Sequence, residues 1–158
     1  MNRSRAGFSM VELLVVISIM GILVMFAVPK IRTFRAGNNL RSAKAQVASS
    51  LATARAAAIQ KGRQAVFAVR GNNLAVVVDT SATSGIQALV VLSSVPIDDR
   101  YGATISLTLP ADSNVTYDSR GFGATGSGAT AKYVLRVSGM TDSVCVSPLG
   151  LINKRGCL

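Results

Sequence analysis

The feature that most constrains this chain is a mostly apolar run near its N-terminus, which extends from Phe8 to Val28. As an α-helix this run would be roughly 31 Å long at about 1.5 Å per residue, which matches the hydrocarbon thickness of a bilayer. Arg3 and Arg5 precede the run, and basic residues beside a membrane segment keep their side in the cytoplasm. The sequence therefore predicts one membrane-spanning segment, with the rest of the chain outside the cytoplasm.

Two ordinary alternatives are a cleaved secretory signal peptide and a plain signal anchor. A signal peptide has an apolar core of about 7 to 15 residues and then a small-residue cleavage site, whereas this run is longer and is followed by Pro29-Lys30. A plain anchor has no use for Glu12, because an acid at the centre of a membrane helix costs about 2.5 to 3.5 kcal/mol on insertion scales. Glu12 lies near the start of the run, where snorkelling lowers that cost, yet an acid in such a segment marks a candidate functional site.

The residues around Glu12 resemble the N-terminus of the type IV pilin and type II secretion pseudopilin superfamily. The resemblance lies in Gly7 followed by Phe8, with Glu12 as the fifth residue counting from Phe8. In that superfamily a membrane prepilin peptidase cuts after the glycine and methylates the new N-terminus, and the glutamate helps dock the subunit into a growing filament. The resemblance thus implies that Gly7 and Phe8 are processing residues and that Glu12 is the assembly residue. A cationic amine at Phe8 would also help the membrane tolerate the carboxylate.

The same resemblance implies a location and a set of partners. The chain would pass once through the bacterial inner membrane, with its C-terminal domain in the periplasm, and would enter a filament after assembly. Its partners would be prepilin peptidase and other pilin or pseudopilin subunits. We expect a prepilin leader at 1–7, the transmembrane half of the N-terminal helix at 8–28, its amphipathic half at 29–61, and an extracytoplasmic β-sheet domain at 62–158.

The second part of the helix is predicted from apolar spacing. Pro29 removes one helical hydrogen bond and, by the resemblance, marks an assembly hinge, and Gly37-Asn38-Asn39 is a weak helix breaker. Apolar residues then recur every three or four positions up to a stop at Gly62, and polar residues fall on the opposite face. The apolar positions are Leu40, Ala43, Val47, Leu51, Ala54 and Ala58, and the polar positions are Ser42, Gln46, Ser49 and Thr53. Arg41, Lys44 and Arg55 flank the stripe, where we expect solvated charges.

From residue 64 onward the pattern changes to short strands separated by turns. The expected strands are 65–69, 74–79, 88–93, 104–109, 114–118, 132–137, 143–147 and 151–153, with turns at 71–73, 80–85, 96–99, 110–113 and 121–128. A helix followed only by strands predicts an α+β, pilin-like fold, in which a long N-terminal helix packs against an antiparallel β-sheet.

Three loose patterns in this region resemble the GspH/FimT family of minor pilins. They are the helix end at 51–59 with Gly62 and the strand at 65–69, the segment from Val115 to Gly121, and the segment from Val144 to Gly150. An arginine commonly follows the last of these glycines in that family, but here Leu151 follows Gly150. Any role of that arginine therefore does not transfer to this chain.

Cys145 and Cys157 are the two cysteines of the sequence. Outside the cytoplasm such a pair predicts a disulfide, which closes a loop of about a dozen residues and could contribute up to roughly 3 kcal/mol. Two free thiols are the alternative. A metal site would need more ligands, and the sequence has no histidine, so we expect no metal or other cofactor.

Gly121 to Gly126 reads as G-x-G-x-x-G, the spacing of a dinucleotide-binding turn. That site needs a helix opening among the glycines, whereas the sequence continues into more small residues and a strand, so a flexible loop is favoured. Because no nucleophile, base and orienting group can be assembled, we expect no enzyme.

The net charge of +10 is concentrated in the helix, since no acid occurs between Glu12 and Asp79. Lys30, Arg32 and Arg35 follow the apolar run, where anionic headgroups are more plausible ligands than nucleic acid. Two functions remain. One is a structural minor pilin or pseudopilin that helps initiate or cap a type IV pilus or a type II secretion pseudopilus. The alternative is a minor pilin that binds DNA during uptake, with Lys154 and Arg155 as candidate DNA-binding residues.

Overall fold

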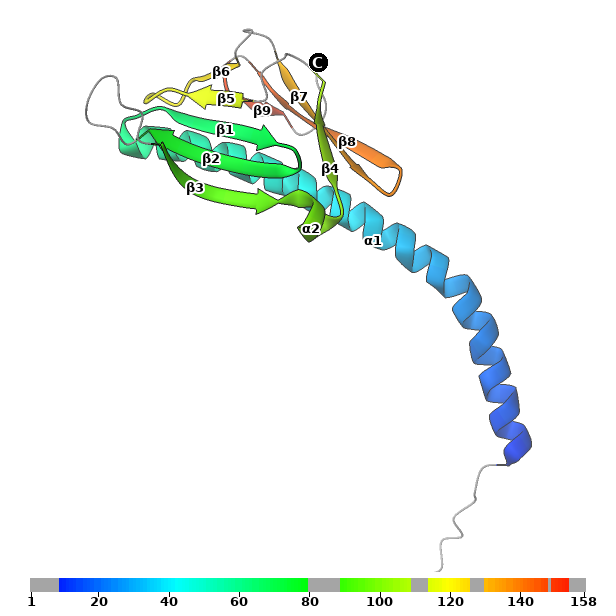
Figure 1. Cartoon of the computed structure of the whole chain (residues 1–158). Coiled ribbons are helices and arrows are strands. Elements are labelled where there is room, and N and C mark those ends of the chain that lie inside the picture. Colours follow the sequence, from blue (N-terminus) through cyan, green and yellow to red (C-terminus); the bar gives the residue numbers. More distant parts are fainter. Residues whose placement is uncertain (1–8, 80–88, 109–113, 126–129, 148, 154–158) are drawn as a thin grey trace, which may run out of the picture. The chain divides into compact units, whose positions relative to one another are not determined.

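The computed structural model describes residues 9–79, 89–108, 114–125, 130–147 and 149–153 (Figure 1). In chain order the elements are α1 (Met10–Lys61), β1 (Ala65–Arg70), β2 (Asn73–Asp79), β3 (Leu89–Pro96), α2 (Ile97–Tyr101), β4 (Thr104–Leu107), β5 (Asn114–Tyr117), β6 (Gly123–Thr125), β7 (Ala131–Val137), β8 (Met140–Val146) and β9 (Ile152–Asn153). The chain divides into two compact units, one ending at Arg35 and one beginning at Ala36. Each unit is described by itself.

The first unit contains the N-terminal part of α1. This stretch is long and apolar enough to cross a membrane, and its apolar window is wholly exposed. Pro29 lies inside the helix, and the hydroxyl of Thr33 donates a hydrogen bond to the Pro29 carbonyl at 3.1 Å. This is the back-bond of a helical threonine to the carbonyl four residues earlier, whereas the carbonyl that Pro29 leaves without its usual N–H partner is that of Met25.

The second unit is built on the rest of α1, which remains helical through 37–39. The expectation of a break there was wrong, because Ala36 and Leu40 on either side are buried and their packing outweighs weak helix propensity. The predicted apolar stripe is confirmed, since all six of its residues are buried. Opposite it, Ser42, Ser49 and Thr53 are exposed and Gln46 is half-buried. The helix ends as predicted at Gly62, whose φ is 61°.

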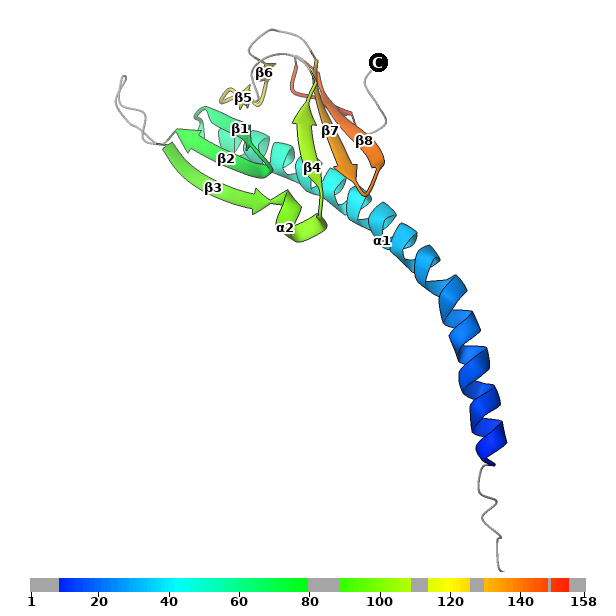
Figure 2. The ribbon, with the colours of Figure 1, turned by 45° about the vertical axis from the view of Figure 1, so that its right-hand side comes forward.

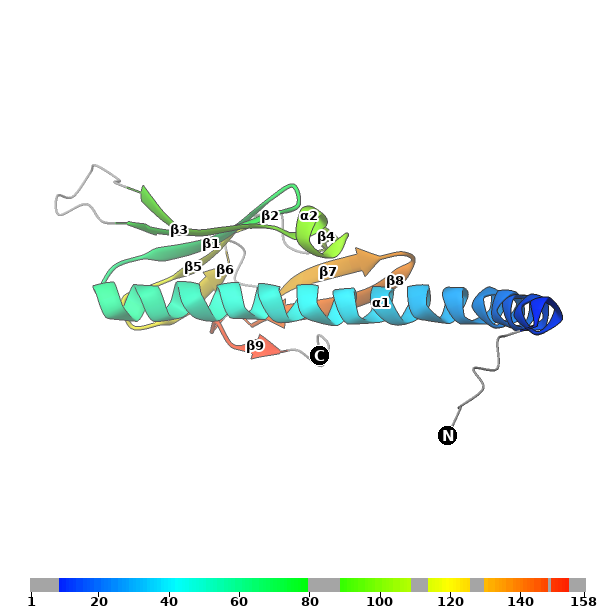
Figure 3. The same cartoon turned by 90° about the horizontal axis from the view of Figure 1, so that it is seen from below.

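The strands form two antiparallel sheets where the sequence suggested one. The first has the order β3-β2-β1-β5-β6 and the second has the order β4-β7-β8-β9. Figure 2 shows β4, β7 and β8 side by side, and in Figure 3 α1 crosses the same side of both sheets. Buried side chains from the helix and from both sheets form one hydrophobic core. The α+β, pilin-like fold class is therefore confirmed.

Each predicted strand matches an observed strand, apart from residues 88 and 109, which lie outside the described residues, but two predicted turns are different structures. Pro96 ends β3, and residues 97–99 are the start of α2, whose C-cap is Gly102 with a φ of 59°. Within 121–128, the segment Gly123–Thr125 is strand β6 and pairs with β5. Such a short Gly-Ala-Thr strand carries no apolar pattern, so only its partner strand defines it. The turns expected at 80–85 and 110–113 lie outside the described residues.

Two tyrosines fill the centre of the core. The rings of Tyr133 and Phe67 meet edge to face, with centroids 5.5 Å apart, and Tyr117 is fully buried. Neither tyrosine hydroxyl has a hydrogen-bond partner among the described residues. Burial raises the pKa of Tyr117 to about 12, although nearby Arg55 acts in the opposite direction. Burial, and then Tyr117, also raise the pKa of Tyr133, so both phenols stay neutral at physiological pH.

Candidate assembly site

Glu12 lies in the first turn of α1, which Ser9 caps. The Ser9 hydroxyl accepts a hydrogen bond from the backbone N–H of Val11 at 3.3 Å, and the Ser9 carbonyl accepts one from Leu13 at 3.1 Å. Ser9 and Glu12 therefore stand at the spacing of a capping box, a signal that the sequence contains and that our sequence analysis missed. A carboxylate at this end of a helix is favourably placed in the field of the helix dipole.

The Glu12 side chain is exposed, and none of the residues that the structure describes pairs with its carboxylate. Gly7 and Phe8, the expected processing residues, lie outside the described residues. The side chains around Glu12 are large, apolar and mostly more than half exposed, with Met10 at 82% and Leu13 at 57%. An apolar surface of this kind requires lipid or other apolar helices around it. In those surroundings a carboxylate is better tolerated when a cation lies close enough to pair with it.

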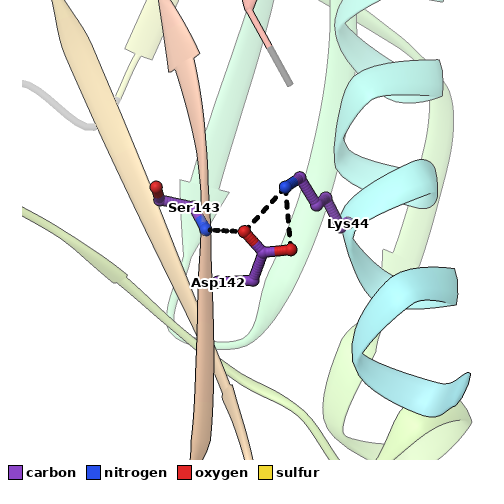
Figure 4. Close-up of polar contacts among 3 residues, drawn as sticks. All are labelled: Lys44, Asp142 and Ser143. Atoms are coloured by element: carbon purple, nitrogen blue, oxygen red, sulfur yellow. Dashed lines mark hydrogen bonds and ion pairs between the residues drawn. The ribbon is translucent and has the colours of Figure 1, made fainter. Parts of the chain in front are cut away.

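Lys44 makes an ion pair that corrects the expectation of a solvated charge (Figure 4). From α1 its ammonium group donates to both carboxylate oxygens of Asp142 on β8, at 2.6 and 2.7 Å. Oδ1 of Asp142 also accepts the backbone N–H of Ser143 at 2.7 Å. The side chain of Lys44 is only 18% exposed, so the pair ties the helix to the second sheet.

We expect Asp142→Asn to lower the free energy of unfolding by about 1 to 2 kcal/mol, because it leaves a partly buried ammonium group without its ionic partner. Thermal unfolding of the detergent-solubilised chain measures this. Asp99→Asn, an exposed acid of α2, is the control and should change stability by less than about 0.5 kcal/mol. Raising the salt concentration should shrink the difference. Equal stability of the two variants would contradict an energetic role for the pair.

Three glycines bring distant turns together. The φ of Gly150 is 77°, and a Cβ atom built on Gly123 would lie 2.5 Å from the Gly150 Cα. A Cβ built on Gly121 would lie 2.7 Å from Cδ1 of Ile59 on α1. The glycines of the G-x-G-x-x-G pattern that the structure describes therefore permit close packing of backbone and side chains. Gly126 lies outside the described residues.

Asp118 organises the turn between β5 and β6. Its Oδ1 atom accepts hydrogen bonds from the backbone N–H groups of Phe122 at 2.8 Å and Arg120 at 2.9 Å. Its Oδ2 atom accepts a hydrogen bond from the Nε–H group of Arg120 at 3.2 Å. These hydrogen bonds lower the pKa of the Asp118 carboxyl group. The bond from Phe122 has the largest effect, and the bonds from Arg120 add to it. The turn is thus held by charge-assisted hydrogen bonds.

The remaining expected site residues lie at the C-terminal side. Cys145 is buried on β8, 1% exposed. Its expected partner Cys157 lies outside the described residues, so this disulfide stays a prediction. Lys154 and Arg155, the candidate DNA-binding residues, also lie outside the described residues. No group of three or more His, Cys, Asp or Glu side chains suited to a metal ion occurs in the described part of the chain.

Comparison with known proteins finds the N-terminal motif and a similar fold. The family model of the prokaryotic N-terminal methylation motif matches residues 2–28. Crystal structures of the type IV minor pilin FimU from Pseudomonas aeruginosa (strain PAO1) match the fold. In space group P21 the identity is 19%, with 78% of this chain and 92% of that chain covered and a TM-score of 0.57. In space group P65 the identity is 18%, with 74% of this chain and 93% of that chain covered and a TM-score of 0.54. No curated protein matches the chain.

Proposed function

Because this chain has the N-terminal methylation motif and the fold of the type IV pilin superfamily, we propose that it is a minor pilin or pseudopilin. It acts as a structural subunit, and it helps initiate or cap a type IV pilus or a type II secretion pseudopilus. Prepilin peptidase removes the leader 1–7, segment 8–28 holds the mature subunit in the inner membrane, and the domain that follows lies in the periplasm.

One observation supports this proposal most directly. Glu12 has no partner among the described residues, and it lies in an exposed apolar helix whose N-terminal turn Ser9 caps. A membrane anchor gains nothing from such a carboxylate, since its burial in lipid is unfavourable. A filament subunit gains a specific contact, because the new amine at Phe8 of a neighbouring subunit supplies a cation.

The DNA-binding alternative depends on Lys154 and Arg155. These residues are outside the described part of the chain, and the described residues add no observation that favours it. The proposal is therefore restricted to the structural role.

Processing provides the first test. We expect mass spectrometry of the mature protein to find Phe8 at its N-terminus, carrying one additional methyl group. Gly7→Val should block cleavage and leave Met1 on a protein that accumulates in the membrane. Ala6→Val, one residue earlier, is the matched control and should be processed normally. Protein recovered from filaments with an intact Met1 would refute the proposal.

A further inference from the structure

The second unit exposes a group of large apolar side chains that its core does not use. Ile59 is 51% exposed, Phe122 is 54% exposed, Leu149 is 61% exposed and Leu151 is 56% exposed. They come from the end of α1, the β5–β6 turn and the β8–β9 turn. We call these four residues the turn patch.

Backbone contacts place the members of the turn patch on neighbouring segments. Ile59 lies beside Gly121, at one end of the β5–β6 turn. Gly150 lies beside Gly123, at the other end of that turn. Phe122 lies between these two glycines, and Leu149 and Leu151 flank Gly150. All three glycines are buried while the four side chains are exposed. The side chains therefore extend from three segments that are in contact.

The turn patch is held in a defined shape. Asp118 fixes the backbone around Phe122, as described above. In the other turn the Ser147 carbonyl accepts the N–H of Gly150 at 2.8 Å, and the Ser147 hydroxyl accepts the N–H of Leu151 at 3.1 Å. The N–H of Ser147 donates to the Leu151 carbonyl at 2.9 Å. A preorganised apolar surface loses little conformational entropy when it binds.

Cations border the turn patch. The guanidinium carbon of Arg120 lies 5.8 Å from the centre of the Phe122 ring, and the Arg120 side chain is 79% exposed in its pair with Asp118. Nε of Arg55 lies 3.2 Å from the Cβ position of Gly121. Asp118, the acid nearest in sequence, already binds Arg120 and two backbone N–H groups. With two arginines against the single carboxylate of Asp118, the surface combines an apolar centre with an edge of one net positive charge.

We propose that the turn patch docks against another protein subunit, whose contact surface is apolar and edged by carboxylates. Exposed aromatic and arginine side chains are characteristic of protein interfaces. A nucleic-acid strand would need stacking platforms and phosphate contacts, whereas three of the four patch residues are aliphatic. This inference rests on the proposed function in one respect, which is that the partner is a subunit of the same filament.

The first test compares filament incorporation of full-length variants. The triple variant Phe122→Ser, Leu149→Ser and Leu151→Ser removes most of the patch without changing the buried core. Val90→Ser with Val91→Ser is the matched control, because these valines of β3 are 46% and 58% exposed. We expect normal membrane levels of both variants and a loss of incorporation of about tenfold for the triple variant alone, as truncated interface anchors produce. Arg120→Glu should also reduce incorporation.

The second test identifies the partner by photo-cross-linking, with p-benzoylphenylalanine at position 149 of the full chain in assembled filaments. The expected product joins this position to an Asp- or Glu-containing surface of another protein that carries the N-terminal methylation motif. A nuclease-sensitive product, a phospholipid adduct or normal incorporation of the triple variant would overturn the inference. If the unaltered chain itself is absent from filaments, the proposed function fails instead.

Discussion

Glu12→Ala is expected to insert into the membrane and to be processed at Gly7, yet to reach filaments at about one tenth of the normal level or less. The apolar helix and the leader are unchanged, so insertion and cleavage remain. In the proposed function, assembly loses a carboxylate that would pair with a cation in apolar surroundings, and every 1.4 kcal/mol of lost contact energy lowers an association constant about tenfold. The measurement is the ratio of the protein in sheared filaments to that in membranes.

Glu12→Gln separates charge from shape in this experiment. The amide has almost the same size as the carboxylate but cannot form an ion pair, so we expect it to assemble as poorly as the alanine variant. Ser9→Ala, which removes only the helix cap, should lower helix stability by about 1 kcal/mol and leave assembly largely intact. Normal incorporation of Glu12→Ala would refute the role of the carboxylate.

Gly150→Val should destabilise the second unit by about 2 to 5 kcal/mol. A side chain at a φ of 77° adds about 1 to 2 kcal/mol of backbone strain, and forcing it against the backbone of Gly123 adds roughly 1 to 3 kcal/mol. This sum is a large share of the stability only for a domain near the low end of the ordinary range of roughly 5 to 15 kcal/mol. Limited proteolysis and thermal unfolding of the solubilised chain measure the loss.

A substitution at Gly139 is the control that separates the effect of the steric contact from the effect of the positive φ. Its φ is 83°, but a Cβ atom there would meet nothing within 4 Å. Gly139→Val should therefore show the backbone strain alone and remain folded. If the two variants lose the same stability, the contact between Gly123 and Gly150 contributes nothing.

Local patterns in the sequence were sufficient to predict the helix and most strands. The stripe of Leu40, Val47 and Leu51 follows the helical repeat, and each of these side chains is buried. The division into two sheets was not predictable in this way, because it depends on β4 pairing with β7, whose residues are distant in the chain. The Asp142 partner of Lys44 was missed for the same reason, since no spacing rule links positions so far apart.

The candidate site was predictable in part. Gly7, Phe8 and Glu12 form a compact motif, and the methylation-motif model covers all three. The roles of Gly123 and Gly150 could not be foreseen, because a glycine that permits close packing looks the same in sequence as a glycine in a flexible loop. The turn patch was invisible for a related reason, since its four side chains come from three separate segments.

The pairing order of the first sheet determines the order in which its strands can pair while the chain is being made. Strand β1 lies between β2 and β5, and its residue Ala65 pairs with Val78 on one side and with Tyr117 on the other. The hairpin with β2 closes over a short loop and so forms early, whereas β5 emerges much later. Until it arrives, one edge of β1 has unpaired backbone groups, which invite aggregation and proteolysis. The growing chain is therefore most prone to aggregation and proteolysis after Asp79 has been made and before Tyr117 has followed.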